Sequence, residues 1–300
     1  MRITVTGATG LVGAALVRRL AERGDHVTVL TRSPGRASEA LGVQAVAWDP
    51  MAGPAPVDGL SGRDAVVHLA GEPVAQRWSD ATKRAIRDSR REGTANLVAG
   101  LRAADPRPAT LLSASASGYY GPHGEEPVDE STAPGDDFLA QVCREWERRA
   151  LDAQELGLRV ALIRTGVVLS GDGGALATML PPFRLGVGGP VAGGRQFVPW
   201  IHLDDVVGLY LAALDDDRYR GAINASAPKP ATNRELSKAL GRALHRPAVA
   251  PVPALALRML YGEMAQIVVN GVNLVPRRAT ELGFAHLHPD LDEALRAALA

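Results

Sequence analysis

The sequence is poor in cysteine and has no excess of charge of either sign. Its single cysteine, Cys143, excludes an intrachain disulfide framework. The 33 basic and 33 acidic residues give a formal net charge of zero, so we expect neither nucleic acid nor a polybasic membrane contact as a partner. The seven histidines are scattered, with no pair at i, i+4 spacing and no second cysteine nearby, so their spacing predicts no metal site.

Long apolar runs and a signal-peptide pattern are also missing. No stretch of 18 apolar residues occurs, and Met1 leads directly into a strand pattern, so we expect a cytoplasmic protein. The composition, with 46% hydrophobic and 22% charged residues, is typical of a folded globular chain. A chain of 300 residues is long enough for two domains or for one large α/β unit.

The first thirty residues follow the order strand, glycine-rich turn, helix, strand. Residues 2–6 and residues 26–31 (HVTVLT) have the β-branched composition of buried strands. The string GATGLVG at 7–13 separates the first of these from a helical pattern at 14–23. This context favours a dinucleotide-binding turn, and the alternative is that the glycines only form a turn.

Each glycine of this string has a physical role in that prediction. Gly7 permits a tight turn after the strand, Gly10 lets the backbone approach a pyrophosphate, and Gly13 lets the helix pack closely on the sheet. The free N–H groups at the helix N-terminus then face the phosphates. The predicted phosphate-binding residues are Gly7, Thr9, Gly10, Leu11, Val12 and Gly13.

The end of the second predicted strand indicates which cofactor binds. An NAD-binding chain places an acid there to accept from the ribose 2′-hydroxyl. This sequence has Thr31, Arg32 and Ser33, with Arg36 close behind. A guanidinium holds a 2′-phosphate through paired hydrogen bonds, so we predict NADP, with NADPH favoured over NADH. The alternative is that Arg32 is a solvated loop charge.

Strands and helices alternate through the next hundred residues. The patterns predict strands at 43–48, 64–69, 110–115 and 159–164, and helices at 79–104 and 136–156. The first helix is expected to have Ser79 as its N-cap and to pack Ile86, Leu97 and Leu101 on the sheet. We therefore predict an α/β fold, a Rossmann-type doubly wound parallel sheet with a smaller, interleaved C-terminal lobe. Residues 1–225 would form the NADP-binding domain, with substrate-lobe segments at about 171–200, and residues 226–300 the C-terminal substrate lobe.

The GATGLVG string resembles the extended, epimerase-like branch of the short-chain dehydrogenase/reductase superfamily. The strings HLAG (68–71) and RTGV (164–167) resemble two further cofactor segments of that branch. The loop carrying Glu72 and Arg77 is expected to overhang the cofactor, although these two residues can equally form a surface ion pair. Asp49 is predicted to accept from the adenine amino group or to form a turn. The further cofactor residues expected are Trp48, Asp49, Leu69, Ala70, Gly71, Glu72, Arg77, Ser113, Arg164, Gly166 and Val167.

The catalytic motif of that branch is missing from this sequence. No Y-x-x-x-K occurs, and ungapped alignment places Leu139 at the tyrosine position, Cys143 at the lysine position and Ala116 where a Ser or Thr belongs. The tyrosine is the acid/base of the branch, and the lysine lowers its pKa. Three alternatives remain: another hydroxyl serves as acid, Glu72 or Glu145 does so, or the chain binds NADP without catalysis. The candidate hydroxyl residues are Tyr119, Tyr120, Ser115 and Ser117.

Two longer strings resemble one atypical group of extended reductases. SASASGYYG at 113–121 and GDDFLAQVCREWE at 135–147 are similar to a group described as epimerase-family proteins, whose bacterial members are also labelled cell-division-inhibitor-like. The residues after 276 resemble that group's small C-terminal extension. The resemblance implies an NADP-dependent oxidoreductase or nucleoside-sugar-epimerase-like enzyme on a small-molecule substrate. The alternative is a non-catalytic, redox-sensing NADP-binding regulator.

Three expectations concern the last hundred residues. The glycine-rich stretch 171–194, interrupted by a helix expected near 175–185, has the length and flexibility of a substrate loop. Asp204 and Asp205 are predicted to be an N-cap pair for a helix at 206–214. Residues 255–260 and 291–299 are predicted to be amphipathic helices, whose apolar faces contact either the core or a second subunit. The oligomeric state is open, and a dimer is compatible with this pattern.

Overall fold

The computed structural model describes residues 1–300, and a seven-stranded sheet with all strands parallel lies at its centre. Its order, β3-β2-β1-β4-β5-β7-β11, confirms the predicted doubly wound fold. In this order β1 lies between β2 and β4, so the chain reverses its direction across the sheet there. The strands are β1 (Arg2–Thr6), β2 (His26–Thr31), β3 (Gln44–Ala47), β4 (Ala65–His68), β5 (Thr110–Ala116), β7 (Arg159–Thr165) and β11 (Gly221–Ala225).

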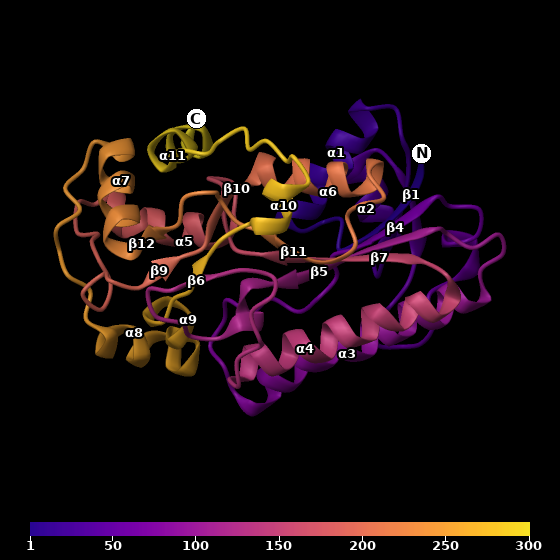
Figure 1. Ribbon diagram of the computed structural model, residues 1–300, viewed down its shortest axis with the longest axis horizontal. Coiled ribbons are helices and arrows are strands. Elements are labelled where there is room, and N and C mark those ends of the chain that lie inside the picture. The colour runs from indigo at the N-terminus through magenta and orange to yellow at the C-terminus, as the bar shows by residue number, and fades with distance from the viewer.

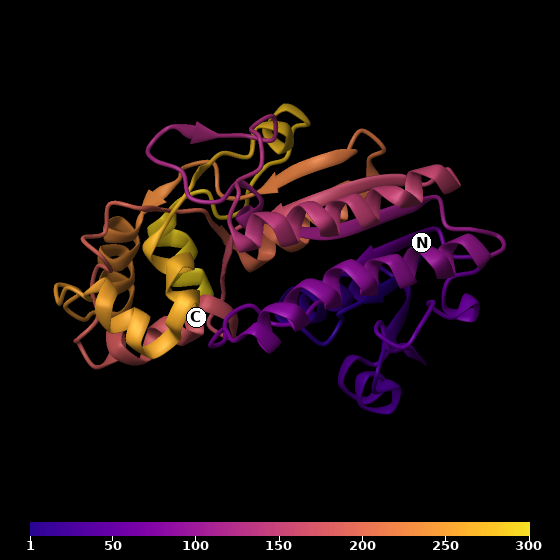
Figure 2. The ribbon, with the colours of Figure 1, turned by 90° about the horizontal axis from the view of Figure 1, so that it is seen from below.

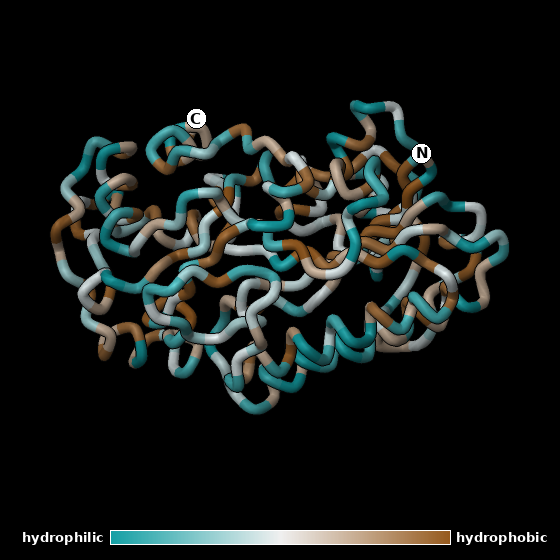
Figure 3. Tube along the Cα trace, in the orientation of Figure 1, coloured by the Kyte–Doolittle hydropathy of each residue, from teal (hydrophilic) through white to brown (hydrophobic).

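Helices cover both faces of the sheet, as Figures 1 and 2 show. On one face lie α1 (Leu11–Glu22), α2 (Pro34–Leu41) and α6 (Leu203–Asp215), and on the other α3 (Asp80–Ala103) and α4 (Phe138–Leu151). Hydrophobic residues concentrate in the strands and on the inner helix faces, while the outer sides of α3 and α4 are hydrophilic (Figure 3). Burial of such inward-facing side chains is the main term that stabilises the layers.

The prediction for the long helix at 79–104 is confirmed in detail. The side chain of Ser79 accepts from the Thr82 N–H, which caps α3. Ile86, Leu97 and Leu101 of this helix are fully buried. The predicted helix at 136–156 begins after the N-cap Asp137, and a 3-10 turn replaces its last five residues.

A smaller lobe is built from segments on both sides of α6, as predicted for an interleaved lobe (Figure 1). Its helices are α5 (Gly174–Arg184), α7 (Asn233–Leu244), α8 (Ala254–Tyr261), α9 (Ala265–Val269) and α11 (Leu291–Leu299). The short helix α10 (Arg277–Glu281) instead packs on β11, with Ala279 in the core of the central sheet. Three two-stranded sheets join distant segments: β8 (Val167–Leu169) with β10 (Trp200–His202), β9 (Phe197–Val198) with β12 (Ala231–Thr232), and β6 (Pro127–Val128) with β13 (Asn273–Leu274). Short 3-10 helices are η1 (Val57–Gly59), η2 (Ser117–Tyr120), η3 (Asp152–Leu156) and η4 (Gly262–Met264).

The two amphipathic helices predicted near the C-terminus differ in what they contact. Ala294 and Leu295 of α11 are fully buried in the core of the smaller lobe. Leu255, Met259 and Leu260 of α8 are each about two-thirds exposed. No helix in the chain has both the length and the apolar character that crossing a membrane requires.

The predicted N-cap pair of α6 is wrong. The helix begins at Leu203, and the N-cap is His202, whose Nδ1 accepts from the Asp204 N–H at 3.1 Å. Asp204 and Asp205 therefore lie in the first helical turn, where the positive end of the helix dipole stabilises their negative charges. The buried Asp205 carboxylate instead accepts two backbone N–H groups, from Leu287 at 2.6 Å and from His288 at 3.2 Å. It thereby holds the C-terminal segment against α6.

Gly13 provides a direct test of how tightly α1 packs on the turn before it. A Cβ at Gly13 would lie 2.3 Å from the Gly7 carbonyl oxygen and 2.8 Å from the Ala8 Cα, both backbone atoms. We predict that Gly13→Ala lowers the free energy of unfolding by about 1–3 kcal/mol, because the helix must shift. The measurement is urea unfolding of the cofactor-free protein. Gly35→Ala, in α2 with no atom near the added Cβ, should be neutral or slightly stabilising. Equal effects of the two substitutions would contradict the packing described here.

Candidate functional site

The candidate site begins at the carboxyl ends of β1 and β4, where the order of strands reverses. Open parallel sheets bind ligands in the crevice at such a point. Gly7 adopts a φ of 69°, and a Cβ on it would lie 2.6 Å from the Leu69 carbonyl carbon, so only glycine fits between the two strand ends. At Gly10, by contrast, a Cβ would meet one atom within 4 Å, at 3.4 Å, so this residue faces open space.

The N-terminus of α1 is suited to hold a diphosphate in that space. The helix starts immediately after Gly10, and no side chain caps it. Its first turn carries no acidic residue, so its backbone N–H groups are available to an anion. The geometry therefore fits the predicted role of the glycine-rich turn.

A second concentration of donors follows β2. Arg32 and Ser33 are exposed, and Ser33 is the N-cap of α2 without a side-chain capping bond. The first turn of α2 contains no acid, and Arg36 on it is exposed. Thr31 differs, because its hydroxyl accepts from the Ser33 N–H at 3.3 Å. This end of the crevice offers positive charge, a free hydroxyl and an uncapped helix, which are donors for a phosphate.

Other predicted cofactor residues show local contacts of their own. The Asp49 carboxylate accepts from the Met51 N–H at 3.0 Å, so Asp49 forms the turn that was one of its two predicted roles. Its contact with adenine, the other role, stays a prediction. Trp48 is buried, and its indole N–H donates to the Gly53 carbonyl. Ser113 is fully buried in β5, where its hydroxyl donates to the Ala114 carbonyl oxygen.

Glu72 and Arg77 do not form the ion pair that was one alternative. Glu72 accepts from the Gln76 side chain at 3.2 Å, and Arg77 donates to the Met259 carbonyl at 3.5 Å. The Arg77 contact joins the loop after β4 to α8 of the smaller lobe, so the loop bridges the two parts of the molecule.

Arg90 of α3 supports the turn after β4, a residue that sequence reasoning missed. Its guanidinium donates to the Glu72 and Ile86 carbonyl oxygens, each at 3.0 Å, and a Cβ on Gly71 would lie 3.1 Å from its Cζ. The guanidinium also packs 4.9 Å from the Trp146 ring centroid. A positive charge therefore lies directly beneath the loop expected to border the nicotinamide ribose.

Cys143, which the ungapped alignment above places at the lysine position, lies on α4. The thiol is buried, and burial together with the Glu147 carboxylate raises its pKa to about 12. Cys143 is therefore a neutral thiol at physiological pH and supplies neither charge nor a nucleophile.

A buried ion pair lies at the carboxyl ends of β5 and β7. The Arg164 guanidinium donates through Nε and Nη2 to the two carboxylate oxygens of Glu147, each at 2.8 Å. Ser115 donates to the same carboxylate at 2.6 Å. Burial alone would lower the pKa of Arg164. The hydrogen bonds and the negative charge of Glu147 have the larger, opposite effect, so the pKa is raised and the guanidinium stays charged.

Tyr120 extends this network to β11. Its hydroxyl accepts from Arg164 Nη1 at 2.9 Å and donates to the Asn224 side-chain oxygen at 2.7 Å. Tyr120 is fully buried, and burial raises its pKa to about 12. The ring of Tyr119 lies against the same guanidinium, with its centroid 3.4 Å from the Arg164 Cζ. Five elements thus share one polar network.

The network decides which predicted catalytic hydroxyls are available. Those of Tyr120 and Ser115 are buried and bonded within it, so neither is free to donate to a substrate. Tyr119 and Ser117 are only half-buried. The Arg164 side chain is likewise bonded to Glu147 and Tyr120, so a cofactor contact at Arg164 would be made by its backbone, and that contact stays a prediction.

Two further predicted residues have clear structural roles. A Cβ on Gly166 would lie 1.9 Å from the Pro199 carbonyl oxygen, so glycine there lets β8 and the segment before β10 approach. Glu145, an alternative acid, lies on α4 with its carboxylate 3.9 Å from Arg91 of α3. It therefore faces the neighbouring helix.

Comparison with known protein families divides the chain into two matched regions. Residues 3–225 match the NAD dependent epimerase/dehydratase family, and residues 252–298 match a domain of unknown function, DUF1731. The first region includes the parallel sheet except for Arg2, and the second includes the helices from α8 to α11 except for Leu299.

Individual proteins are similar over the full length. An Arabidopsis thaliana protein named "Epimerase family protein SDR39U1 homolog, chloroplastic" is 43% identical over 99% of this chain and 86% of its own. The crystal structure of human epimerase family protein SDR39U1 (isoform 2) with NADPH is 34% identical, with a TM-score of 0.89 over 100% of this chain and 99% of that one. A Bacillus cereus UDP-glucuronic acid 4-epimerase shares the fold, with 17% identity and a TM-score of 0.80 over 100% of this chain and 98% of its own.

Removing one partner of the buried ion pair tests how much the pair contributes to the stability of the fold. We predict that Glu147→Gln lowers the free energy of unfolding by about 3–5 kcal/mol, because it leaves the Arg164 charge buried without its counter-ion. Glu145→Gln on the same helix is the matched control and should change stability by less than about 1 kcal/mol, since its ion pair is long and partly exposed. Urea unfolding of both variants is the measurement. If Glu147→Gln lowers the free energy of unfolding no more than Glu145→Gln does, the buried ion pair does not stabilise the fold in the way described.

Proposed function

The chain belongs to the NAD dependent epimerase/dehydratase family, and on that premise we propose that it is an NADP(H)-dependent oxidoreductase or epimerase-like enzyme acting on a small organic molecule. NADP(H) is preferred to NAD(H) because of one observation: Arg32 and Ser33 offer exposed hydrogen-bond donors at the uncapped N-terminus of α2. A 2′-phosphate is the part of NADP(H) that needs such donors.

The residues that would hold the cofactor lie along the carboxyl edge of the sheet. The α1 N-terminus with Gly7 and Gly10 would bind the pyrophosphate, and the turn at Ala70 and Gly71 would border the nicotinamide ribose. When bound, the nicotinamide supplies or accepts a hydride. The NADPH in the human relative's crystal structure supports this choice of cofactor.

Tyr119 is the hydroxyl that we assign as proton donor to the substrate. It follows the carboxyl end of β5, is half-buried, and has its ring against the Arg164 guanidinium. Arg164 and Arg90 would provide the fixed positive charge that a lysine provides in related enzymes. Cys143 at the lysine position is neutral, so these two arginines are the nearest substitutes that the fold offers.

The alternative of a non-catalytic, redox-sensing regulator is not favoured by the comparisons, since the relatives reported above carry epimerase names. The cytoplasmic location stays a prediction, and the name of the Arabidopsis relative refers to the chloroplast. The small-molecule substrate stays a prediction as well.

Reversing the charge at Arg32 tests the cofactor assignment. We predict that Arg32→Asp weakens NADPH binding about 10- to 100-fold, as expected for the loss of a charged hydrogen bond, and changes NADH binding far less. The measurement is calorimetric titration of each variant with both cofactors. Arg102→Asp, exposed near the end of α3, has the same change in net charge and should alter neither affinity. Equal weakening of NADPH and NADH by Arg32→Asp would exclude a 2′-phosphate contact.

Replacing Tyr119 tests the catalytic assignment. We predict that Tyr119→Phe slows NADPH oxidation by a panel of small aldehydes and ketones about 10²- to 10⁴-fold, while the Kd for NADPH is unchanged. Tyr219→Phe, in the segment after α6, is the control and should keep the wild-type rate. Full activity of Tyr119→Phe would remove this tyrosine from the mechanism. A wild-type protein that binds NADPH but reduces no member of the panel would favour the regulator.

A further inference from the structure

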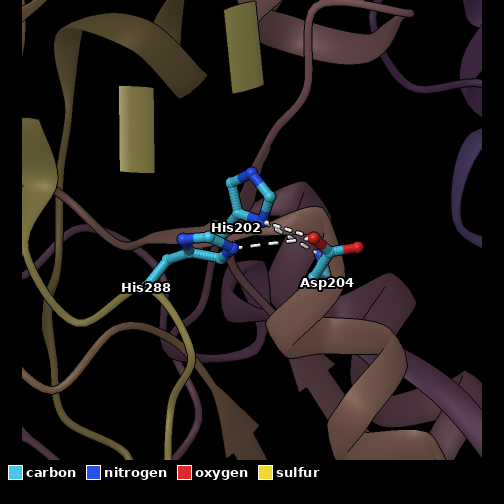
Figure 4. A group of neighbouring side chains, drawn as sticks. All are labelled: His202, Asp204 and His288. Carbon is cyan, nitrogen blue, oxygen red and sulfur yellow. Dashed lines mark hydrogen bonds and ion pairs between the residues drawn. The ribbon is translucent and has the colours of Figure 1, made fainter. Parts of the chain in front are cut away.

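His202 and Asp204, two residues apart at the start of α6, meet His288 from near the C-terminus (Figure 4). His202 ends β10, Asp204 lies in the first turn of α6, and His288 lies in the segment between α10 and α11. The Asp204 Oδ2 is 3.7 Å from His202 Nδ1 and 3.6 Å from His288 Nε2. The two imidazole rings lie close together, with centroids 3.9 Å apart.

These separations suit a divalent ion of the zinc class. A tetrahedral ion with bonds of about 2.0–2.1 Å holds neighbouring ligand atoms about 3.3–3.5 Å apart. The two nitrogen–oxygen distances exceed this by a few tenths of an ångström, and all three ligand atoms lie within 4.8 Å of one another. Imidazole nitrogen and carboxylate oxygen are also the donor types that zinc prefers after thiolate.

A fourth residue fixes the orientation of one ligand. His288 Nδ1 lies 2.9 Å from a carboxylate oxygen of Glu293 on α11. With the proton on Nδ1 donated to Glu293, the lone pair of Nε2 faces Asp204, as Figure 4 shows for this ring. A carboxylate behind the outer nitrogen of a histidine is the arrangement that commonly orients metal ligands. The Asp205 carboxylate fixes the backbone of Leu287 and His288 as well.

The other ligands are equally well placed. His202 Nδ1 accepts the Asp204 N–H, so this nitrogen carries a lone pair and no proton, on the side that faces the carboxylate. An ion would take over this lone pair, and the Asp204 N–H, which has no partner within the helix, would be left to water at this exposed residue. The Asp204 side chain is 59% exposed, which gives the ion a route of entry and room for a water as fourth ligand.

We propose that His202, Asp204 and His288 bind one zinc-class divalent ion, oriented through Glu293, that ties the C-terminal segment to the parallel-sheet domain. His202 and Asp204 belong to the region that matches the epimerase/dehydratase family, and His288 and Glu293 to the region that matches DUF1731. The ion therefore fastens one matched region to the other. This proposal does not depend on the identity of the cofactor or of the substrate.

The test is zinc binding to the full chain after treatment with a chelator. Zinc chloride is titrated into the protein in competition with a chromophoric chelator, and the expected result is one zinc per chain. His288→Ala should weaken binding at least tenfold, and Glu293→Gln about 10- to 100-fold, as expected for loss of an orienting carboxylate. His26→Ala, an exposed histidine elsewhere, should bind as the wild type does.

Thermal unfolding provides the second readout. Zinc should raise the Tm of the wild type and of His26→Ala, but not that of His288→Ala, because only a folded site binds the ion. Asp204→Asn, with its exposed side chain, removes a ligand even if His288→Ala folds poorly. Wild-type protein that takes up no zinc, or variants that bind zinc as tightly as the wild type does, would overturn the proposal.

Discussion

The ion pair between Arg164 and Glu147 is the interaction around which the functional edge of this protein is organised. It connects a strand and a helix, and through Ser115, Tyr120 and Asn224 it reaches two further strands and a 3-10 turn. A buried charge is tolerated only when it is paired and hydrogen-bonded, and here each guanidinium nitrogen and each carboxylate oxygen has a partner. The loops that would surround a substrate therefore start from a rigid base.

This network also explains how the chain differs from enzymes with a Tyr-x-x-x-Lys motif. The positions of that motif carry Leu139 and Cys143, and the thiol is neutral. Positive charge reaches the same region from other elements, through Arg164 on β7 and Arg90 on α3. Tyr119 lies against the first of these, at the end of β5 where an open parallel sheet places its reactive groups. In the proposed enzyme, the positive charge of the lysine would therefore come from neighbouring strands and helices, while the glycine turn keeps the spacing G-x-x-G-x-x-G.

Sequence reasoning succeeded where the signal was local. The alternation of strands and helices, the glycine spacing and the Ser79 cap each depend on neighbouring residues, and each is seen in the structure. It failed where partners are distant, because spacing along the chain does not show which side chains meet. The sequence does not show that the Arg164 side chain pairs with Glu147 on another element. Nor does it show that Asp205, predicted to be a cap, binds the backbone of Leu287 and His288. The histidine cluster was invisible for the same reason.

The central claim is that the glycine turn and the donors after β2 together form an NADP(H) site. Calorimetric titration of the wild-type chain with NADPH and with NADH tests it most directly. We predict that one NADPH binds per chain and that NADH binds at least about tenfold more weakly, because it lacks the 2′-phosphate. Binding of neither cofactor, or equal binding of both, would contradict it.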